Sequence, residues 1–164
     1  LVRNGIDHGE IFDHHMVEYT YASGLKMMSQ CRHIPGTASS VSEHAHGTRG
    51  TADVGAGRIE SAGGWKWRFR DEDPNPYQVE HDDLFNAVRT GAAYNEAVNG
   101  AKSSMTSIMG RMATYSGQII RWEEAIESSQ DLSPKEYTWN ATPPVVPDKH
   151  GRYPIAMPGV TKAF

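Results

Sequence analysis

Hydrophobic and polar positions alternate with a period of two along the first part of the chain. Ile11 to Tyr21 is rich in β-branched and aromatic residues, and Leu25 to His33 repeats the pattern after the short stretch Ala22-Ser23-Gly24. Period two is typical of half-buried strands, and glycine reaches the positive φ of a tight turn at low cost. The pattern therefore predicts a β-hairpin over residues 11–33.

The register of this hairpin follows by counting outward from Tyr21 opposite Leu25. Because side chains alternate between faces, a slip of one residue would move every side chain to the other face. The pairs predicted in this way are Tyr19 with Met27, Val17 with Ser29, His15 with Cys31, Asp13 with His33 and, on the other face, His14 with Arg32.

Shorter strands are predicted after Pro35-Gly36 breaks the chain. The stretches are Ser40 to His46, Thr51 to Val54 and Arg58 to Glu60, with Gly47-Thr48-Arg49-Gly50 as the turn after the first. Trp65, Trp67 and Phe69 then alternate with Lys66, Arg68 and Arg70. This alternation predicts a strand with an aromatic face turned inward and a cationic face turned to solvent.

The pattern changes to a helical period after Pro74. Tyr77 to Thr90 places His81, Leu84, Phe85 and Val88 on one stripe and ends at Gly91. In a second predicted helix, Ala101 to Tyr115, apolar residues recur at i, i+3, i+4 and i+7, which favours a core stripe: Met105, Ile108, Met109 and Met112. A short strand over Gln118 to Trp122 and a helical turn over Glu123 to Ser128 are expected to follow.

Strands followed by helices indicate an α+β fold: an open, mainly antiparallel or mixed β-sheet with helices packed on one face. A chain of 164 residues usually forms one domain, so we expect a single domain over residues 1–164. From Leu132 the chain is rich in proline and aromatic residues. Residues 132–164 are therefore expected to form an extended tail packed on that domain.

Composition narrows the classes of function. The net charge of −4 gives no basic surface for nucleic acid, and no apolar run is long enough to span a bilayer. Cys31 is the only cysteine, which excludes an intrachain disulfide and favours a small buried apolar side chain. Both a cytoplasmic and an exported bacterial protein remain compatible, because a leader would lie upstream of Leu1.

Several short motifs follow one another in a recognisable order. Phe85, Val88 and Gly91 close one predicted helix, and Thr114 to Ile120 contains Ser-Gly before a short aliphatic stretch. Gly47 to Thr51 forms a Gly-Thr-Arg-Gly-Thr turn. In this order and spacing the chain resembles the C-terminal domain of the Gfo/Idh/MocA family of NAD(P)-dependent oxidoreductases. The stretch Asn4 to Arg32 and the tail motifs Trp139 to Pro144 and Pro154 to Gly159 resemble a subgroup abundant in planctomycetes.

The resemblance implies an open sheet with helices on one face and a second face used for subunit contacts. It also implies a separate N-terminal Rossmann domain that binds NAD or NADP. That domain is expected to be a missing partner, because Gly55-Ala56-Gly57 begins a nucleotide-binding pattern but Glu60 replaces its third glycine. We therefore expect no catalytic residue, no cofactor-binding residue, no metal ligand and no bound cofactor in this chain.

Histidines provide the candidate chemistry. On the predicted register, Asp13, His14, His15, Arg32 and His33 converge at one end of the hairpin, and His44 and His46 lie on one face of the next strand. Three interpretations remain open: ordinary sheet histidines, residues lining a site for a sugar or polyol, or a metal site built on His44 and His46.

Three functions follow from these interpretations. The first is the substrate-side and oligomerisation half of a nicotinamide-dependent dehydrogenase acting on a sugar, inositol or related polyol, inactive alone and expected to form a homo-oligomer through its sheet face. The second is a non-catalytic carbohydrate-binding or assembly module. The third is a metal-dependent hydrolase that uses the histidines.

Overall fold

The computed structural model describes residues 2–3 and 9–164. Residues 4–8, with which the likeness over Asn4 to Arg32 begins, lie outside the described residues. The chain divides into two compact units: unit 1, Leu1–Pro35 with Glu96–Phe164, and unit 2, Gly36–Asn95. The expected single domain stays a prediction.

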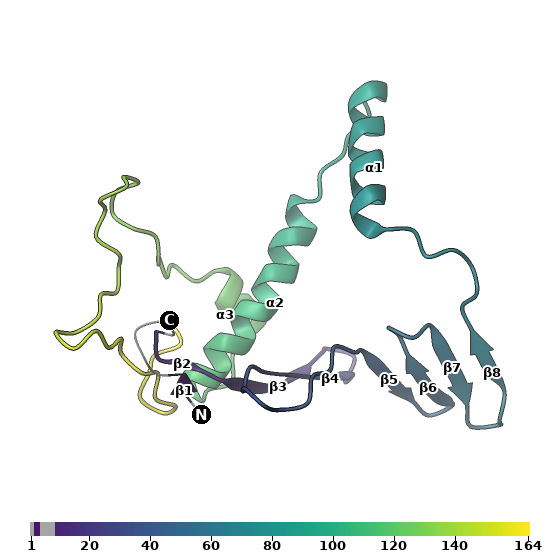
Figure 1. Cartoon of the computed structure of the whole chain (residues 1–164), viewed down its shortest axis with the longest axis horizontal. Helices are drawn as coiled ribbons and strands as arrows, with labels where there is room; N and C mark the ends of the chain where they lie inside the picture. The colour runs from purple at the N-terminus through teal and green to yellow at the C-terminus, as the bar shows by residue number, and fades with distance from the viewer. Residues whose placement is uncertain (1, 4–8) are drawn as a thin grey trace. The chain divides into compact units, whose positions relative to one another are not determined.

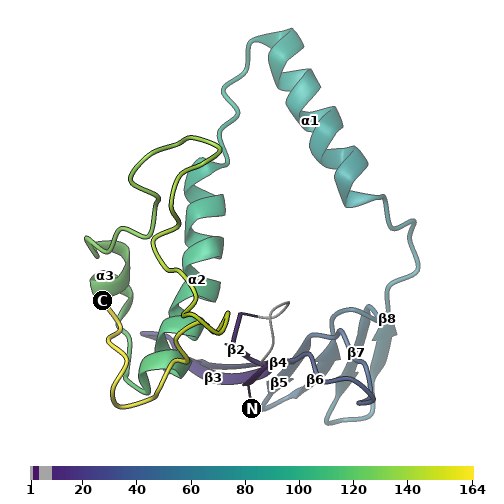
Figure 2. The same cartoon turned by 60° about the vertical axis from the view of Figure 1, so that its left-hand side comes forward.

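The described residues of unit 1 form two antiparallel strand pairs and two helices (Figure 1). Strand β1 (Val2–Arg3) pairs with β2 (Ile11–Phe12), and β3 (His14–Thr20) pairs with β4 (Lys26–Arg32). Helix α2 (Ala97–Ser116) packs against β3, and the short helix α3 (Trp122–Ile126) packs against α2. Figure 2 shows α2 rising from β3 with α3 beside it.

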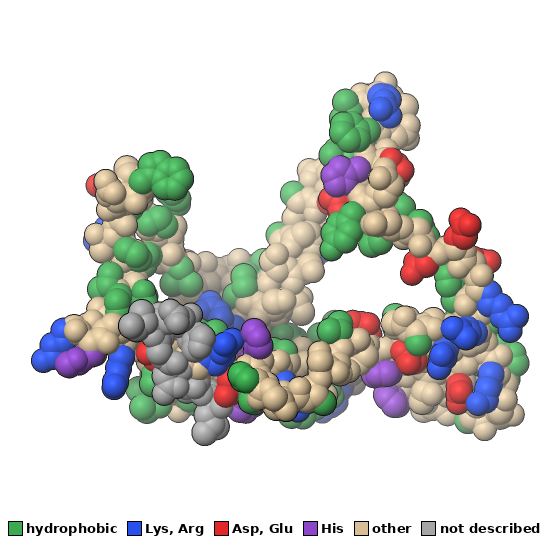
Figure 3. Space-filling view, in the orientation of Figure 1, with side chains coloured by type: hydrophobic (Ala, Val, Ile, Leu, Met, Phe, Trp, Pro, Cys, Tyr) green, Lys and Arg blue, Asp and Glu red, His purple; other side chains and the backbone are tan. Residues whose placement is uncertain are grey.

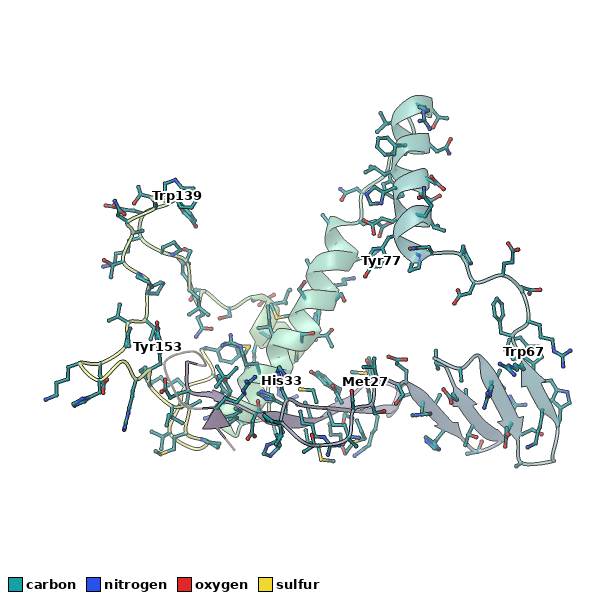
Figure 4. All side chains as sticks on the ribbon, viewed as in Figure 1. Met27, His33, Trp67, Tyr77, Trp139 and Tyr153 are labelled. Carbon is teal, nitrogen blue, oxygen red and sulfur yellow. The ribbon has the colours of Figure 1, made fainter. Side chains whose placement is uncertain are left out.

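The predicted register of the β3–β4 hairpin is confirmed. His14 pairs with Arg32, His15 with Cys31, Val17 with Ser29 and Tyr19 with Met27. The ends agree, because the Tyr21 N–H donates to the Leu25 carbonyl at 2.9 Å and the His33 N–H donates to the Asp13 carbonyl at 2.8 Å. Figure 4 labels Met27, the second residue of β4, and His33, which directly follows its last residue.

The core of unit 1 lies where α2 and α3 meet. Met109, Met112 and Ala125 are buried together, and Met105 packs against them. This confirms the methionine stripe as core, except at Ile108, which is exposed. The partly buried Tyr19, Ile120 and Trp122 complete the cluster.

Alternate residues of β3 contact α2 through a row of small side chains. Exposure alternates along β3, with His15, Val17 and Tyr19 half-buried. The Tyr19 hydroxyl donates to the Thr106 carbonyl at 2.8 Å, and His15 bonds the Thr114 hydroxyl at 2.8 Å. Residues four apart lie on one helix face, so Thr106, Gly110 and Thr114 form the helix side of this contact.

Unit 2 is a four-stranded antiparallel meander followed by a helix. The strands are β5 (His44–Gly47), β6 (Gly50–Asp53), β7 (Arg58–Ser61) and β8 (Lys66–Arg68), in that order. Helix α1 (Pro76–Thr90) begins where the Asn75 side chain accepts the Tyr77 N–H at 3.0 Å, with Pro76 in the first turn. It ends at Gly91, whose φ of 69° is left-handed.

Two predictions of burial in unit 2 are wrong. Trp67 is 43% and Phe69 is 41% exposed, so the aromatic face of β8 is not turned into a core. On α1, Leu84, Phe85 and Val88 are also exposed, and Figure 3 shows apolar side chains on the surface of this helix. The period of the apolar residues identifies an apolar face but not whether that face is buried. Nothing in unit 2 covers the apolar faces of β8 and α1.

The tail is packed at its end and exposed before it. The Tyr153 N–H donates to the buried Glu10 carboxylate at 2.7 Å, and Ala163 is buried. By contrast, Trp139 is 104% exposed, and Figure 4 shows it at a bend of the tail. Tyr137 and Trp139 are therefore exposed, and the expected packing of residues 132–164 as a whole stays a prediction.

Two local predictions also differ. Cys31 is exposed rather than buried, because α2 packs on β3 and leaves the neighbouring strand uncovered at this residue. Gln118–Arg121 is not a strand, although Arg121 is extended (φ −90°, ψ 145°). The helical turn predicted after it is present as α3.

The protein thus has an α+β fold built from antiparallel sheets and helices. In the described part of the chain, no helix combines the length and the apolar character that crossing a bilayer requires.

Candidate functional site

The end of the β3–β4 hairpin opposite its turn carries the polar cluster that the sequence predicts. We call Asp13, His14, His15, Arg32 and His33 the base cluster. The backbone fixes its layout, because His14 lies directly opposite Arg32 and Asp13 is bonded to His33. Side chains alternate between faces, so Asp13, His15 and His33 lie on the α2 side and His14 and Arg32 on the outer side.

Charge-assisted contacts hold two of the imidazoles. His14 Nδ1 lies 2.5 Å from a carboxylate oxygen of Asp13. A carboxylate accepts, so His14 donates from Nδ1 and, when neutral, keeps Nε2 as an acceptor. Arg3 Nη1 donates to His33 Nδ1 at 3.0 Å, and this places the ring proton of His33 on Nε2. The two histidines therefore offer one acceptor and one donor.

His15 occupies a different environment on the α2 side. Thr114 Oγ1 donates to the Gly110 carbonyl at 3.0 Å, so His15 Nδ1 donates to Thr114 at 2.8 Å. The rings of Phe12 and Tyr115 each have their centroid 5.9 Å from that of His15. Burial, and secondarily the charge of His14, lowers the pKa of His15 below its usual 6.5. Burial thus favours the neutral form of His15, and its bond to Thr114 joins β3 to α2.

A cavity of about 1210 Å³ opens beside β3 in unit 1. It is lined by β3, by one face of α2 and by residues 117–123. Of the base cluster, His14 and His15 line this cavity. Both faces of β3 contribute to the wall, so the cavity runs along the edge of the strand.

The structure brings together five of the seven predicted site residues. His44 and His46 belong to unit 2, where they oppose Asp53 and Thr51 on β6. Among the described residues, no group of three or more histidine, cysteine, aspartate or glutamate side chains is placed to hold a metal ion. The hydrolase interpretation therefore has no ligand set in this part of the chain.

Sequence reasoning missed three contributors to the site. Arg3 lies in a two-residue strand, which is too short to give a periodic signal. Phe12 and Tyr115 surround His15 and meet edge to face, with ring centroids 4.7 Å apart. Tyr115 belongs to the motif Thr114 to Ile120. Its contact with His15 depends on the packing of α2 against the hairpin, which the motif does not predict.

Comparison with protein-family models, curated proteins and solved structures finds no match to this chain. The fold itself bears on the cofactor. Every strand pair in the described residues is antiparallel, whereas a dinucleotide-binding βαβ unit needs parallel strands. The described residues therefore contain no such unit, and the expectation about NAD(P) stays a prediction.

Proposed function

We propose that this chain is the substrate-side and oligomerisation half of a nicotinamide-dependent dehydrogenase that acts on a sugar, inositol or related polyol. The observation that carries the proposal is the base cluster, in which Arg3 bonds His33 and Asp13 bonds His14 at one end of a hairpin. The chain alone is inactive, and NAD or NADP is held by a Rossmann domain that is its missing partner.

The chemistry of the cluster suits a polyhydroxylated ligand. A hydroxyl group both donates and accepts, and the cluster presents an imidazole N–H at His33 on the α2 side and an imidazole acceptor at His14 on the outer side. The Asp13 carboxylate holds the His14 ring, and Arg32 lies opposite His14 in the ladder. His44 and His46 stay a prediction for the same ligand, since they lie in unit 2.

Oligomerisation is proposed through the outer face of the β3–β4 hairpin. On that face Met16 is 66% and Met28 is 56% exposed. Exposed apolar side chains on a sheet face favour burial against a second copy. Light scattering on the purified chain tests this part: a dimer or larger species is expected, and a monomer at all concentrations would contradict it.

Ligand binding is tested on the isolated chain by imidazole ¹H–¹⁵N spectra during titration with myo-inositol and with glucose. The ring signals of His33 and His14 are expected to shift in a saturable way. His33→Ala should abolish the response. The matched control His81→Ala removes an exposed histidine of α1 and should leave it unchanged. Equal responses in both variants would contradict the assignment.

The dehydrogenase itself is tested by the coding sequence on the 5′ side of the Leu1 codon. A βαβ unit with a glycine-rich dinucleotide turn is expected there. Its absence from the gene and from its neighbours would favour the second candidate, a non-catalytic carbohydrate-binding or assembly module. The exposed methionines of the outer hairpin face are the observation that supports the assembly role.

A further inference from the structure

Glu10 is the only buried charged residue in the described part of the chain, with 5% of its surface exposed. It is also the only described residue other than glycine that has a positive φ, at 53°. Left-handed backbone costs a residue with a side chain about 1–2 kcal/mol, and a carboxylate loses hydration when it is buried. Two unfavourable features in one residue point to a contact that needs this side chain at this place.

That contact is a hydrogen bond to the C-terminal tail. The Tyr153 N–H donates to Oε2 of Glu10 at 2.7 Å, across 143 residues of sequence. The Tyr153 ring lies against the same turn, because a Cβ added to Gly9 would lie 3.9 Å from Cδ2 of that ring. Farther along the tail, the Gly159 N–H donates to the Ser116 carbonyl at 2.7 Å. The tail therefore joins the turn before β2 to the end of α2.

Glu10 directly precedes β2, and β2 positions Arg3. In the β1–β2 ladder, Arg3 lies opposite Ile11. A two-stranded pair is marginally stable in water at best, so a pair with two residues in each strand needs support from other elements. The Phe12 ring provides one support, because it meets the Tyr115 ring edge to face with centroids 4.7 Å apart. The Glu10 carboxylate provides a second support at the other end of β2.

Strand β1 in turn reaches the base cluster through Arg3. Arg3 Nη1 donates to His33 Nδ1 at 3.0 Å. This bond keeps the ring proton of His33 on Nε2, which is the donor that the cluster presents. Without Arg3, the proton of a neutral imidazole can occupy either Nδ1 or Nε2. The tautomer of His33 therefore depends on the position of β1.

We propose that Glu10 is a positioning residue of the base cluster, because its bond to Tyr153 ties the tail to β2 and β2 holds Arg3 in place. Arg3 then keeps the ring proton of His33 on Nε2. Attachment of the tail thereby decides which nitrogen of His33 donates. The value of this donor for a polyol site rests on the proposed function, whereas the tautomer of His33 is measured without any ligand.

The test follows the imidazole ¹⁵N signals of the full chain without ligand, at a pH of about 8 where an ordinary histidine is neutral. His33 Nδ1 should give the signal of an unprotonated nitrogen in the native protein. Glu10→Gly removes the carboxylate and suits the positive φ, so it adds no backbone strain. This variant should move the Nδ1 signal toward that of a protonated nitrogen, because the two tautomers then exchange. The Tyr153 amide should also exchange with solvent at least about tenfold faster.

Glu10→Gln and Asp131→Ala are the matched controls. Glutamine keeps an oxygen that can accept the Tyr153 N–H, so the His33 signal should stay near its native position. Asp131 also accepts a backbone N–H of the tail, from Ser133 at 2.9 Å, but this bond lies within the tail itself. Its loss should leave the His33 signal unchanged.

Arg3→Ala tests whether Glu10 acts through Arg3. This variant alone should reproduce the shift of His33 Nδ1 that Glu10→Gly causes. The double variant should shift the signal no further, because both changes remove the same bond. The amides of Met109 and Met112 report whether the core of unit 1 is intact in each variant.

Three outcomes would overturn the proposal. The first is a native Nδ1 signal of His33 in Glu10→Gly. The second is a larger shift in the double variant than in Arg3→Ala, which would mean that Glu10 reaches His33 by another route. The third is a loss of protection at the core amides, which would make Glu10 a general structural residue. Failure of the inositol titration would count against the proposed function alone, because this test contains no ligand.

Discussion

The phenolic hydroxyl of Tyr19 crosses α2 at Gly110, the one position of the contact that has no side chain. A Cβ placed on Gly110 would lie 2.5 Å from that hydroxyl oxygen and 3.6 Å from Cγ2 of Val17. The hydroxyl in turn donates to the Thr106 carbonyl one turn earlier. The close approach of strand and helix therefore depends on a glycine in the middle of the helix.

Replacing Gly110 with alanine should destabilise unit 1 despite the better helix propensity of alanine. Overpacking a close contact costs about 1–3 kcal/mol, and the gain in propensity returns about 1 kcal/mol. We expect a net loss of up to about 2 kcal/mol, measured by amide exchange in α2. Gly100→Ala in the same helix is the control, since nothing lies within 4 Å of its added Cβ. That variant should gain about 0.5–1 kcal/mol.

The hydroxyl of Tyr19 should be coupled to Gly110. Tyr19→Phe alone removes the bond to the Thr106 carbonyl and should cost about 1 kcal/mol. When Gly110→Ala is combined with Tyr19→Phe, the added methyl no longer meets an oxygen, so its cost should fall. A double-mutant cycle measures this coupling, and strictly additive effects would show that the two residues do not share the contact.

Stability of unit 1 should fall as the pH is lowered through the range just below 6.5. Burial lowers the pKa of His15 from its usual 6.5, so the unfolded chain binds more protons in this window than the folded chain. The free energy of unfolding therefore rises with pH across the window and is fully present above it. Urea midpoints at about pH 7.5 and about pH 5.5, on either side of the ordinary histidine pKa, measure the slope. His15→Gln should reduce the slope of the unfolding free energy with pH. His81→Gln leaves His15 in place and should keep that slope.

Two glycines that end helices should respond differently to alanine. Gly91 and Gly117 both have left-handed φ values, 69° and 71°. Left-handed backbone costs an alanine about 1–2 kcal/mol at either position. At Gly117 the new Cβ would also lie 3.0 Å from Cβ of Pro158, whereas nothing lies within 4 Å at Gly91.

The extra contact should make Gly117→Ala the more harmful change. Next to Pro158, the Gly159 N–H donates to the Ser116 carbonyl at 2.7 Å, so relief of the contact would disturb this bond. Amide exchange reads α1 and α2 separately and should show the larger loss of protection in α2. Equal losses of protection would mean that Pro158 moves away from the new methyl group without loss of stability.

The sequence predicts the local structure well because local structure depends on period and turn chemistry. The register from His14 to Thr20 follows from one turn at Gly24, and the stripe through Met109 and Met112 follows from the helical period. What covers an apolar face is a different question. Cys31, Phe85 and Trp139 were expected to be buried, and each is exposed. A pattern marks the face that prefers burial without providing the surface that buries it.

The candidate site also divides into local contacts, which the sequence predicts, and contacts between distant segments, which it does not. Counting along the hairpin places Asp13 beside His33, because both residues belong to one continuous ladder. Counting along the hairpin does not predict the contacts of Arg3 with His33 or of Thr114 with His15, because Arg3 and Thr114 belong to other elements. Such contacts depend on how distant segments pack, and they carry no local signal in the chain.

Unit 1 is assembled from two stretches of chain with the whole of unit 2 between them. The bond from Tyr19 to Thr106 spans 87 residues, so the ribosome must deliver unit 2 before the β3–β4 hairpin can meet its helix. During that interval α2 is not yet available to cover the half-buried face of the nascent hairpin. Synthesis speed between Pro35 and Glu96 thus sets how long this face stays exposed to wrong partners.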